Sequence, residues 1–565
     1  MCGIAAVLGS GVVLESLVQR IAHRGPDSHK CIGTNSVGLG AARLRIHGGA
    51  EADMPLQSRC GSIALVANGE IFNHEMLFGT TQQDSDLQGL ADLWAVEGER
   101  ALTRVRGPFA LALWDRRDDS LLIARDEFGV RPLYWRVEDG VVSVASEAVA
   151  LFGDNPPARD SAAWAHLLAF QFQPAGATLW QGINEVAPGT WLRFRHTPSG
   201  LTQRSGSFQC EGSEDLRSAL LQSGALQRPR SADAALLLSG GVDSSLVLGL
   251  LRAAGALPRL AVVGHFGPQH PHCDERAAAR AVARECAVPL LEVCITPQQH
   301  LAALRPLLRA LGGPNAGPGG PSQWVLAQTL AREGCRIVFS GTGGDEIFGG
   351  YERTRLAQQR AAGVHLRPAA GYQSLAAATG PLAQALLFRG RSLLPLLETE
   401  VAAAVMQASA VLPLDGPNLA TELEAFELRA LLPGLLAVDD RCFAAFGMEG
   451  RVPLLDPLLA HAALRVPLQE RSPEHAPRAL LRAAAADLLP ESAARRRDKM
   501  GFPVPLAEWC AGPWRDALLD PSVGRELEAI GFRPEVRAAL NGGRLAPREQ
   551  WFLLACAFTR EACLP

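Results

Sequence analysis

The sequence has no unbroken apolar run of about 18 residues, the length that a membrane-spanning helix needs, so we expect no such helix. Its first residues lack a basic stretch followed by an apolar one, so we expect no secretory signal and a cytoplasmic location. The twelve cysteines form no CxxC pair, which argues against a zinc ribbon or a thioredoxin-like site. The net charge is only −4, so the overall charge does not favour nucleic acid or an anionic membrane as a partner.

What the sequence does contain is enough apolar material for several cores. Hydrophobic residues make up 48% of the 565 residues and charged residues 20%, as is typical of a globular protein. A chain of this length exceeds one ordinary domain, so two to four domains are expected. The scattered cysteines are expected to be core or incidental residues in a reducing compartment.

The patterning changes near residue 200. Before it, short apolar stretches such as 62–67 and 121–124 are bounded by Gly, Asn and Asp, which predicts strands. The polar stretch 196–214 has the composition of a linker. We therefore expect a first domain over 1–200, a linker over 201–214 and a second domain over 215–565.

The second domain alternates strand-like and helix-like segments. Strands are expected at 234–238, 260–266, 290–295 and 336–339, and helices from 245 onward, at 275–286, at 301–311 and at 322–333. Such alternation predicts an α/β fold with a doubly wound parallel sheet that helices cover on both faces. From about residue 360 to its end the chain is rich in Ala and Leu and is predicted to be mostly helical.

Cys2 is the most distinctive residue of the first domain. Removal of the initiator Met would leave a thiol and an α-amine on one residue, so that nucleophile and base are combined. The α-amine has an unperturbed pKa of about 8, which lets it accept the thiol proton near neutral pH. Cysteine also occurs at position 2 by chance, so this assignment depends on the rest of the chain.

The strongest motif is a loop rich in glycine and serine between a predicted strand and a predicted helix. Backbone N–H groups and the helix dipole at such a junction face an anion, and glycines let the backbone approach a phosphate closely. The hydroxyl groups add donors, and Asp243 is suited to hold a Mg²⁺ ion that bridges phosphates. The loop comprises Leu238, Ser239, Gly240, Gly241, Val242, Asp243, Ser244 and Ser245.

A second glycine-rich loop follows the strand predicted at 336–339. It begins with Ser340 and Gly341 and ends in Asp345 and Glu346. Asp345 is the natural second ligand for Mg²⁺. Two such loops at neighbouring strand ends would form one nucleotide site at the carboxyl edge of the sheet.

These motifs occur, with several others, in the order typical of one known family. The first domain carries CGI at 2–4, HRGPD at 23–27 and NGEIFN at 68–73. With these motifs it resembles the N-terminal-nucleophile glutaminase domain of class II glutamine amidotransferases, an αββα fold. The loop at 239–245 resembles the pyrophosphate loop of ATP pyrophosphatases. Together the two halves resemble glutamine-dependent asparagine synthetase over nearly the whole chain, with further matches at 125–134, 343–351, 449–456 and 499–502.

The resemblance implies that the first domain hydrolyses glutamine through a thioester on Cys2 and passes the ammonia internally to the second. Asn68 and the N–H group of Gly69 would stabilise the tetrahedral oxyanion. Charged residues at the matching positions would hold the glutamine zwitterion. These are Glu70 and Asp86 for its α-amine and Arg43 for its α-carboxylate.

In the second domain the resemblance implies that ATP activates a carboxylate as an acyl-adenylate, releasing pyrophosphate, and that ammonia displaces AMP. ATP and Mg²⁺ are the expected cofactors. Lys499 would stabilise negative charge near the adenylate, and Glu449 would supply acid–base help. Arg478 stands where the family usually has lysine, which keeps the charge but changes the geometry. The residues expected to bind ATP are those of the first loop, apart from Val242, together with Val263, Ser340, Gly341 and Arg478.

Three departures from the family pattern bear on the acceptor. Thr342 stands where asparagine synthetases usually carry Glu or Asp, and a threonine hydroxyl is a very poor base. The run Gly312, Gly313, Pro314, Asn315 replaces an Asp-Glu-Pro-like segment, and His47 replaces a common Asp. Two interpretations stay open. Either these loops have drifted around an unchanged acceptor, or the acceptor is a different carboxylate in a specialised biosynthetic pathway.

The leading hypothesis is glutamine-hydrolysing, ATP-dependent amidation with aspartate as the default acceptor. A homodimer is compatible with it, and neither nucleic acid nor a membrane is an expected partner. A degenerate synthetase that acts by binding partners is disfavoured because Asp243, Asp345 and Lys499 are intact. A tRNA-modifying ATP pyrophosphatase is disfavoured because the chain has no CxxC pair and no concentrated basic stripe.

Overall fold

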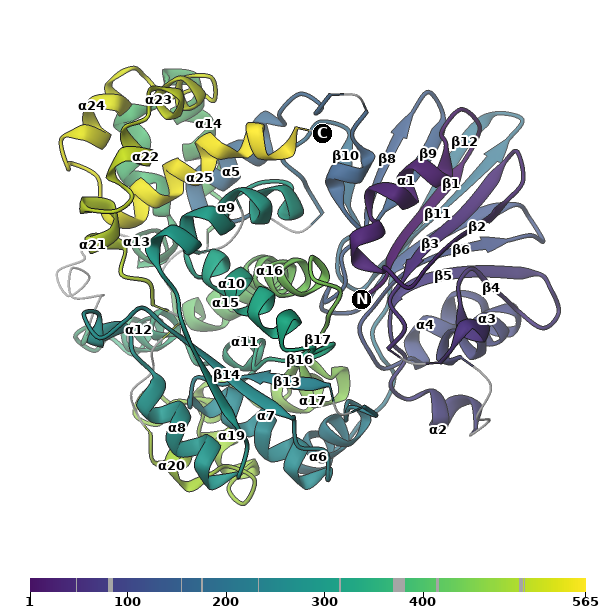
Figure 1. The fold of residues 1–565 in the computed structure, drawn as a ribbon, viewed down its shortest axis with the longest axis horizontal. Helices are drawn as coiled ribbons and strands as arrows, with labels where there is room; N and C mark the ends of the chain where they lie inside the picture. Colours follow the sequence, from purple (N-terminus) through teal and green to yellow (C-terminus); the bar gives the residue numbers. More distant parts are fainter. Residues whose placement is uncertain are drawn as a thin grey trace.

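The structure, a computed structural model, describes residues 1–565 except 47, 80–84, 154, 174–175, 232, 315–316, 369–381, 413–415, 497–500, 502 and 565. The first part of the chain forms two facing sheets, and the second forms a further sheet surrounded by helices (Figure 1). Among the described residues, no helix has both the length and the apolar character that crossing a bilayer would require.

The first two sheets are antiparallel, with strand orders β10-β8-β9-β1-β3-β2 and β12-β11-β7-β6-β5-β4. Their strands are β1 (Gly3–Leu8), β2 (Ser28–Gly33), β3 (Val37–Arg43), β4 (Leu56–Gln57), β5 (Ile63–Gly69), β6 (Phe109–Asp115), β7 (Ser120–Arg125), β8 (Tyr134–Glu138), β9 (Val141–Ala145), β10 (Ile183–Glu185), β11 (Thr190–Thr197) and β12 (Gly200–Ser207).

A shared apolar core joins these two sheets. Ile4 and Leu39 of one sheet lie in it with Leu65, Leu111 and Ile123 of the other, and none of the five is exposed. In Figure 1, α1 lies on the outer face of the first sheet and α3 beyond the second, which completes the αββα arrangement. The helices of this part are α1 (Leu14–Arg20), α2 (His74–Phe78), α3 (Asp86–Glu97), α4 (Ala101–Arg104) and α5 (Ser161–Phe170).

The third sheet is parallel, with the order β15-β14-β13-β16-β17. Its strands are β13 (Ala234–Leu237), β14 (Leu260–His265), β15 (Leu290–Cys294), β16 (Ile337–Phe339) and β17 (Glu449–Arg451). The chain moves from β13 to β15 in one direction and then returns to the other side of β13. The order therefore reverses between β13 and β16, and ligands of open α/β sheets bind at such a reversal.

Helices cover both faces of this sheet, because alternate residues of a strand point to opposite sides. Leu236 packs with Leu246 of α7 (Val242–Ala253), whereas Ala235 packs in the other core with Val325 of α10 (Gly319–Arg332). This confirms the predicted doubly wound fold. The remaining helices up to residue 361 are α6 (Leu216–Leu226), α8 (Arg276–Glu285), α9 (Pro297–Leu311), α11 (Gly344–Phe348) and α12 (Glu352–Ala361).

The described residues after 361 are mostly helical, as predicted. The helices are α13 (Leu382–Leu387), α14 (Thr399–Ser409), α15 (Leu419–Phe426), α16 (Leu432–Ala444), α17 (Pro457–Leu464), α18 (Leu468–Arg471), α19 (Ala479–Ala484), α20 (Glu491–Arg495), α21 (Leu506–Ala511), α22 (Arg515–Leu519), α23 (Pro521–Glu528), α24 (Glu535–Asn541) and α25 (Pro547–Cys563). The exception is the buried strand β17. Its three residues are too few to show the alternation of apolar and polar residues from which a strand is predicted.

The segment expected to be a linker differs from its prediction. Residues 201–207 belong to β12, which pairs with β11 in a hairpin, so only 208–215 lie outside helices and strands before α6. β12 is an edge strand with largely exposed side chains, so it needs no apolar alternation and its composition resembles that of a linker.

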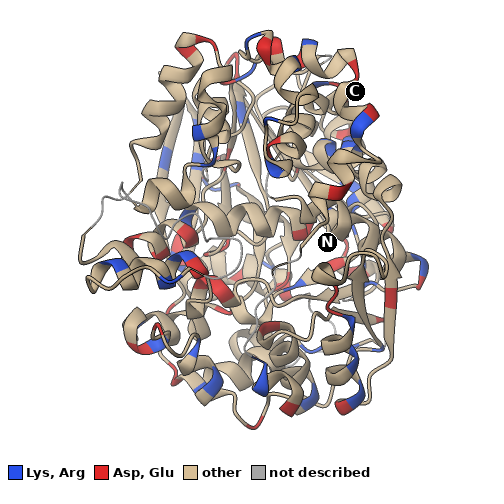
Figure 2. Cartoon of the chain, turned by 90° about the vertical axis from the view of Figure 1, so that its left-hand side faces the viewer, with Lys and Arg blue, Asp and Glu red and all other residues tan. Residues whose placement is uncertain are grey.

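Positive and negative side chains are interspersed over the elements seen in Figure 2, in keeping with the small net charge.

Candidate active sites

Cys2 lies at the start of β1 and is held through its backbone. Its N–H group donates a 3.0 Å hydrogen bond to Oδ1 of Asn68, near the end of β5, so the two sheets meet at this residue. Its Sγ lies 3.9 Å from the carbonyl oxygen of Leu44. The neighbouring strand β3 ends at Arg43, so the residue expected to bind the carboxylate of glutamine adjoins the thiol.

Asn68, which accepts the N–H of Cys2, and Gly69 are the last two residues of β5. Asn68 is fully buried, and its Nδ2 group has no hydrogen-bond acceptor among the described residues. A buried donor without a partner is costly, so an incoming oxyanion would be stabilised there. Gly69 has a φ of 149°, and a Cβ atom at this position would lie 2.0 Å from the carbonyl oxygen of Pro108. Only glycine fits at this turn.

The three residues predicted to bind glutamine are fixed by other groups. Nη1 of Arg43 donates to Oδ1 of Asp53 at 2.7 Å, and Oδ2 of Asp86 accepts the backbone N–H of Ile71 at 2.8 Å. Glu70 forms a 2.7 Å ion pair with Arg451 of β17, in the second domain. The site is therefore tied to the parallel sheet.

Arg24 positions Cys2, although its motif assigned it no role. It is fully buried, and its Nε donates to the carbonyl oxygen of Cys2 at 3.1 Å. Its other nitrogens pair with Glu147 at 2.9 Å and with Asp440 of α16 at 2.8 Å. These contacts join residues 123 and 416 positions apart, so no sequence pattern could have found them.

The first glycine-rich loop joins β13 to α7 and is braced by its own hydroxyl groups. The N–H of Gly241 donates to Oγ of Ser239 at 3.2 Å, and the N–H of Ser239 donates to Oγ of Ser244 at 3.3 Å. Helix α7 begins at Val242, three residues before the predicted start, so Asp243 and Ser244 form its first turn. An acidic residue is stabilised at that end of a helix.

Ser245 and Val263, which are also predicted to bind ATP, are both buried. Ser245 is fully buried within α7, and its hydroxyl has no acceptor among the described residues. Val263 is in β14, directly after Val262, whose carbonyl oxygen accepts the N–H of Leu238 at 2.9 Å. It therefore flanks the strand end from which the loop departs.

The two glycine-rich loops touch, as predicted for neighbouring strand ends. A Cβ atom on Gly341 would lie 2.8 Å from the backbone nitrogen of Ser244 and 2.9 Å from Cβ of Asp243. The second loop leads from β16 into α11, which begins at Gly344 and contains Asp345. The loops therefore flank the point where the strand order reverses.

Arg478 joins the two carboxylates that were predicted to hold Mg²⁺. It is buried, and its guanidinium pairs with Oδ1 of Asp243 and with Oδ1 of Asp345. One cation thus reaches both carboxylates. No cluster of three or more metal-ligating side chains occurs within the described residues. Mg²⁺ commonly takes only one or two carboxylates and completes its shell with phosphate oxygens and water, so this pair fits it.

Glu449 lies at the start of β17 and shares Arg451 with Glu70. Its Oε1 pairs with Nε of Arg451 at 2.8 Å. Burial acts to raise the pKa of Glu449, but the charges of Arg451, of the α-amine of Met1 while that residue is present, and of Arg131 lower this pKa. A single buried guanidinium therefore contacts one predicted residue of each active site.

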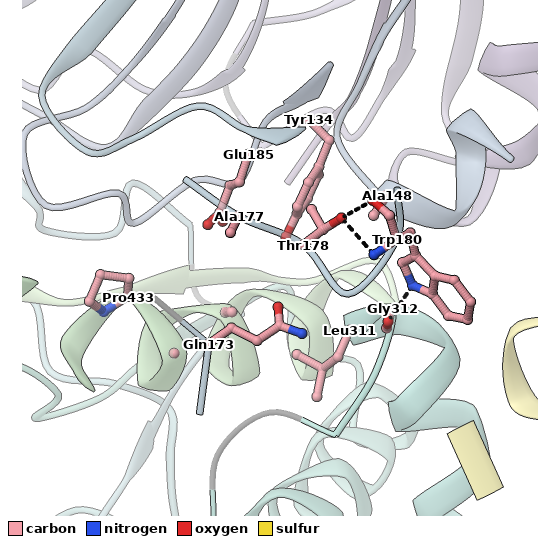
Figure 3. Close-up of a pocket in the computed structure, with 12 residues that line it drawn as sticks. Tyr134, Ala148, Gln173, Ala177, Thr178, Trp180, Glu185, Leu311, Gly312 and Pro433 are labelled. Atoms are coloured by element: carbon pink, nitrogen blue, oxygen red, sulfur yellow. Dashed lines mark hydrogen bonds between the residues drawn. The ribbon is translucent and has the colours of Figure 1, made fainter. Parts of the chain in front are cut away.

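Two of the three departures lie in the described region. Gly312 ends α9 and Gly313 follows, and both pack on the first domain: Nε1 of Trp180 donates to the carbonyl oxygen of Gly312 at 2.7 Å (Figure 3). A Cβ atom on Gly313 would lie 2.4 Å from Cδ1 of Leu179. Packing between the domains therefore explains these glycines. The third departure, His47, and also Asn315 and Lys499 lie outside the described residues.

Comparisons with known proteins agree with this arrangement. Residues 215–558 match the family described as asparagine synthase, and residues 1–203 match that described as glutamine amidotransferase domain. Asparagine synthetase [glutamine-hydrolyzing] 1 of Bacillus subtilis is 26% identical over 90% of this chain and 88% of its own length. Asparagine synthetase [glutamine-hydrolyzing] 2 of Oryza sativa is 30% identical over 62% and 60%. Amidase chyE of Penicillium rubens is 27% identical over 60% and 55%.

Proposed function

The chain belongs to the asparagine synthase family, and on this premise we propose that it transfers the amide nitrogen of glutamine to a carboxylate that ATP has adenylated. Members of this family are enzymes that carry out glutamine-dependent amidation with ATP. The observation that carries the proposal is the pairing of two sites in one chain. Cys2 and Asn68, whose Nδ2 donor has no acceptor among the described residues, form one, and two touching glycine-rich loops form the other.

In the first site, Cys2 attacks the carboxamide carbon of glutamine once Met1 has been removed. Its α-amine accepts the thiol proton, and Nδ2 of Asn68 with the N–H of Gly69 stabilises the oxyanion. Arg43 holds the α-carboxylate of glutamine, and Asp86 with Glu70 holds its α-amine. Arg24 maintains the backbone of Cys2 in place through the bond to its carbonyl oxygen.

In the second site, the glycine-rich loops hold the phosphates of ATP against the first turn of α7. Asp243 and Asp345 would hold Mg²⁺, which would neutralise phosphate charge and orient the reacting groups. Lys499 adds a positive charge. Arg496, three residues earlier in the sequence, reaches the first loop, because Nη1 of Arg496 donates to the carbonyl oxygen of Ser239 at 3.1 Å.

Aspartate is the acceptor that we propose first, with asparagine, AMP and pyrophosphate as products. Gly312 and Gly313 pack on Leu179 and Trp180. This packing accounts for the two glycines without a change of acceptor. Thr342 keeps a second candidate open, in which the same chemistry acts on another carboxylate. The similarity to a protein named an amidase is compatible with that candidate.

The proposal is tested by incubating the chain with glutamine, ATP, Mg²⁺ and aspartate, and by then screening other carboxylates for pyrophosphate release. We expect AMP and pyrophosphate in equal amounts with the amide. Formation of ADP in place of AMP would contradict the adenylation step. Amidation of another carboxylate, with little asparagine formed, would select the second candidate.

A further inference from the structure

A carboxylate lies against Thr342, the loop position at which the chain lacks an acidic residue. The hydroxyl of Thr342 donates to Oδ2 of Asp439 at 2.7 Å, and Oγ of Ser340 lies 2.9 Å from the same oxygen. Asp439 belongs to α16, 97 residues further along the chain, so its approach to this loop is a product of the fold.

The other carboxylate oxygen of Asp439 is held as well. Nε2 of Gln323, in α10, donates to Oδ1 of Asp439 at 2.6 Å. Helices α10 and α16 pack on each other, and α16 also packs on β17, which pairs with β16. Hydrogen bonds from α10 and from the loop after β16 therefore fix the orientation of the Asp439 carboxylate. Asp439, Thr342 and Gln323 are all partly exposed, so a small molecule can approach them.

The partners of Asp439 distinguish it from an ordinary structural carboxylate. Its neighbour Asp440 pairs with Arg24 at 2.8 Å and with Arg441 at 2.7 Å, as buried carboxylates usually do. Within the described residues, Asp439 has only neutral donors as hydrogen-bond partners. Although Asp439 is partly exposed, the loss of water around its carboxylate raises its pKa more than the hydrogen bonds from Gln323, Thr342 and Ser340 lower it, and the charge of Asp440 adds to the rise. Asp439 is therefore a stronger proton acceptor than an exposed aspartate.

We propose that Asp439 accepts the proton released in amide formation and that the hydroxyl of Thr342 relays it. This proposal rests on the proposed function. The nitrogen lone pair of ammonia forms a bond to the carbonyl carbon of the acyl-adenylate, and the bond from that carbon to the AMP oxygen breaks. The nitrogen gives one proton to Oγ1 of Thr342, whose own proton passes to Oδ2 of Asp439. The products are the amide, AMP and a protonated Asp439, which later returns its proton to water.

The experiment separates adenylation from amide formation. Exchange of labelled pyrophosphate into ATP, with L-aspartate or whichever carboxylate supports exchange in the unmodified enzyme, reports adenylation. Amide formation from ammonium chloride with the same carboxylate reports the later step. In Asp439→Asn we expect exchange within about twofold of the unmodified enzyme and amide formation lowered by about 100-fold or more, as for the loss of a general base.

Companion variants test the relay itself. Thr342→Val should lower amide formation as Asp439→Asn does, whereas Thr342→Ser keeps the hydroxyl and should retain most of the activity. Introducing Thr342→Glu into Asp439→Asn should restore amide formation at least tenfold, because a carboxylate then stands in the loop itself. Glu400→Gln, on the exposed side of α14, is the matched control and should change neither reaction.

Two results would overturn the relay. Amide formation that is unchanged in Asp439→Asn would remove Asp439 from the step. A parallel loss of exchange and amide formation would show that Asp439 only shapes the loop. Failure of the proposed function has a different signature, which is the absence of exchange in the unmodified enzyme with every carboxylate, and it would overturn the relay with it.

Discussion

At the scale of single residues, Cys2 is held in place before any substrate binds. Asn68 accepts its N–H, and Arg24 donates to its carbonyl oxygen, so both ends of one residue are fixed. Such preorganisation is where much of the rate enhancement of an enzyme originates. The position of Asn68 and Cys2 next to each other could be predicted from the motifs, but the contribution of Arg24 could not, because it depends on partners in both domains.

We predict that Cys2→Ala abolishes glutamine hydrolysis and leaves amide formation from ammonia within about threefold. The substitution removes the nucleophile and keeps the backbone contacts to Asn68 and Arg24. The measurement is glutamate release together with amide formation from ammonium chloride. Glutamine hydrolysis that persists in this variant would contradict the assignment.

We predict that Arg478→Met lowers the Mg²⁺ concentration needed for half-maximal pyrophosphate exchange by about tenfold, and also lowers the maximal rate. Arg478 forms ion pairs with Asp243 and Asp345 and so competes with the metal, and the charge-assisted hydrogen bond to Asp243 alone is worth at least the roughly 1.4 kcal/mol that a tenfold change requires. Arg478→Lys keeps the charge and serves as the control. An unchanged Mg²⁺ dependence would show that the pairing does not compete with the metal.

At the scale of elements, His300 joins α9 to the helices near the end of the chain. Its ring lies 5.2 Å from that of Trp509 in α21 and 5.0 Å from that of Trp514, and its Nε2 lies 2.9 Å from the carbonyl oxygen of Pro318. Burial lowers the pKa of His300 to about 4. The neutral ring is therefore part of the packed structure.

We predict that the free energy of unfolding falls as the pH drops from about 6.5 to 4, in part because of His300. Over this range the unfolded chain binds a proton at His300 and the folded chain does not, so stability rises with pH. The full decrease in the free energy of unfolding that His300 contributes is about 3 kcal/mol, and it is reached below pH 4. Urea unfolding at pH 7 and pH 5 measures it. His300→Gln should reduce the difference between the two pH values, whereas the exposed His196→Gln should not.

At the scale of the whole molecule, Arg451 is the physical link between the two sites. It is almost fully buried and pairs with Glu70 at 2.7 Å and with Glu449 at 2.8 Å. Glu70 is expected to bind glutamine and Glu449 to serve the second site. Because both carboxylates pair with the same guanidinium, we expect a change in the charge or position of one to affect the other.

We predict that Arg451→Met destabilises the protein by about 3–5 kcal/mol, because two buried carboxylates lose their partner. The loss should be smaller at pH 5 than at pH 8, since the two carboxylates, once they lack the charge of Arg451, take up protons more readily as the pH falls. Urea unfolding at both pH values measures this. Arg204→Met, at an exposed position of β12, is the control. An equal loss at both pH values would mean that the arginine acts only through packing.

The fold class and the position of the two glycine-rich loops could be predicted from the sequence because each depends on local order, whereas the assignment of Cys2 as the nucleophile stays a prediction. Ser239 and Ser340 each follow a predicted strand directly, and parallel strands bring their carboxyl ends together. The contacts of Arg451 with Glu70 and of Asp439 with Thr342 span 381 and 97 residues. The repeat of apolar residues along the sequence does not indicate contacts between residues so far apart. These contacts become visible only in the packed structure.

The most direct test of the account supplies glutamine labelled with ¹⁵N in its amide, ATP, Mg²⁺ and aspartate, together with excess unlabelled ammonium chloride. The screen of other carboxylates then uses the same conditions. We predict that ¹⁵N appears in the amide product and that one AMP and one pyrophosphate form for each amide. Formation of glutamate without consumption of ATP on any carboxylate, or formation of ADP, would contradict the central claim that two sites in this chain act in sequence.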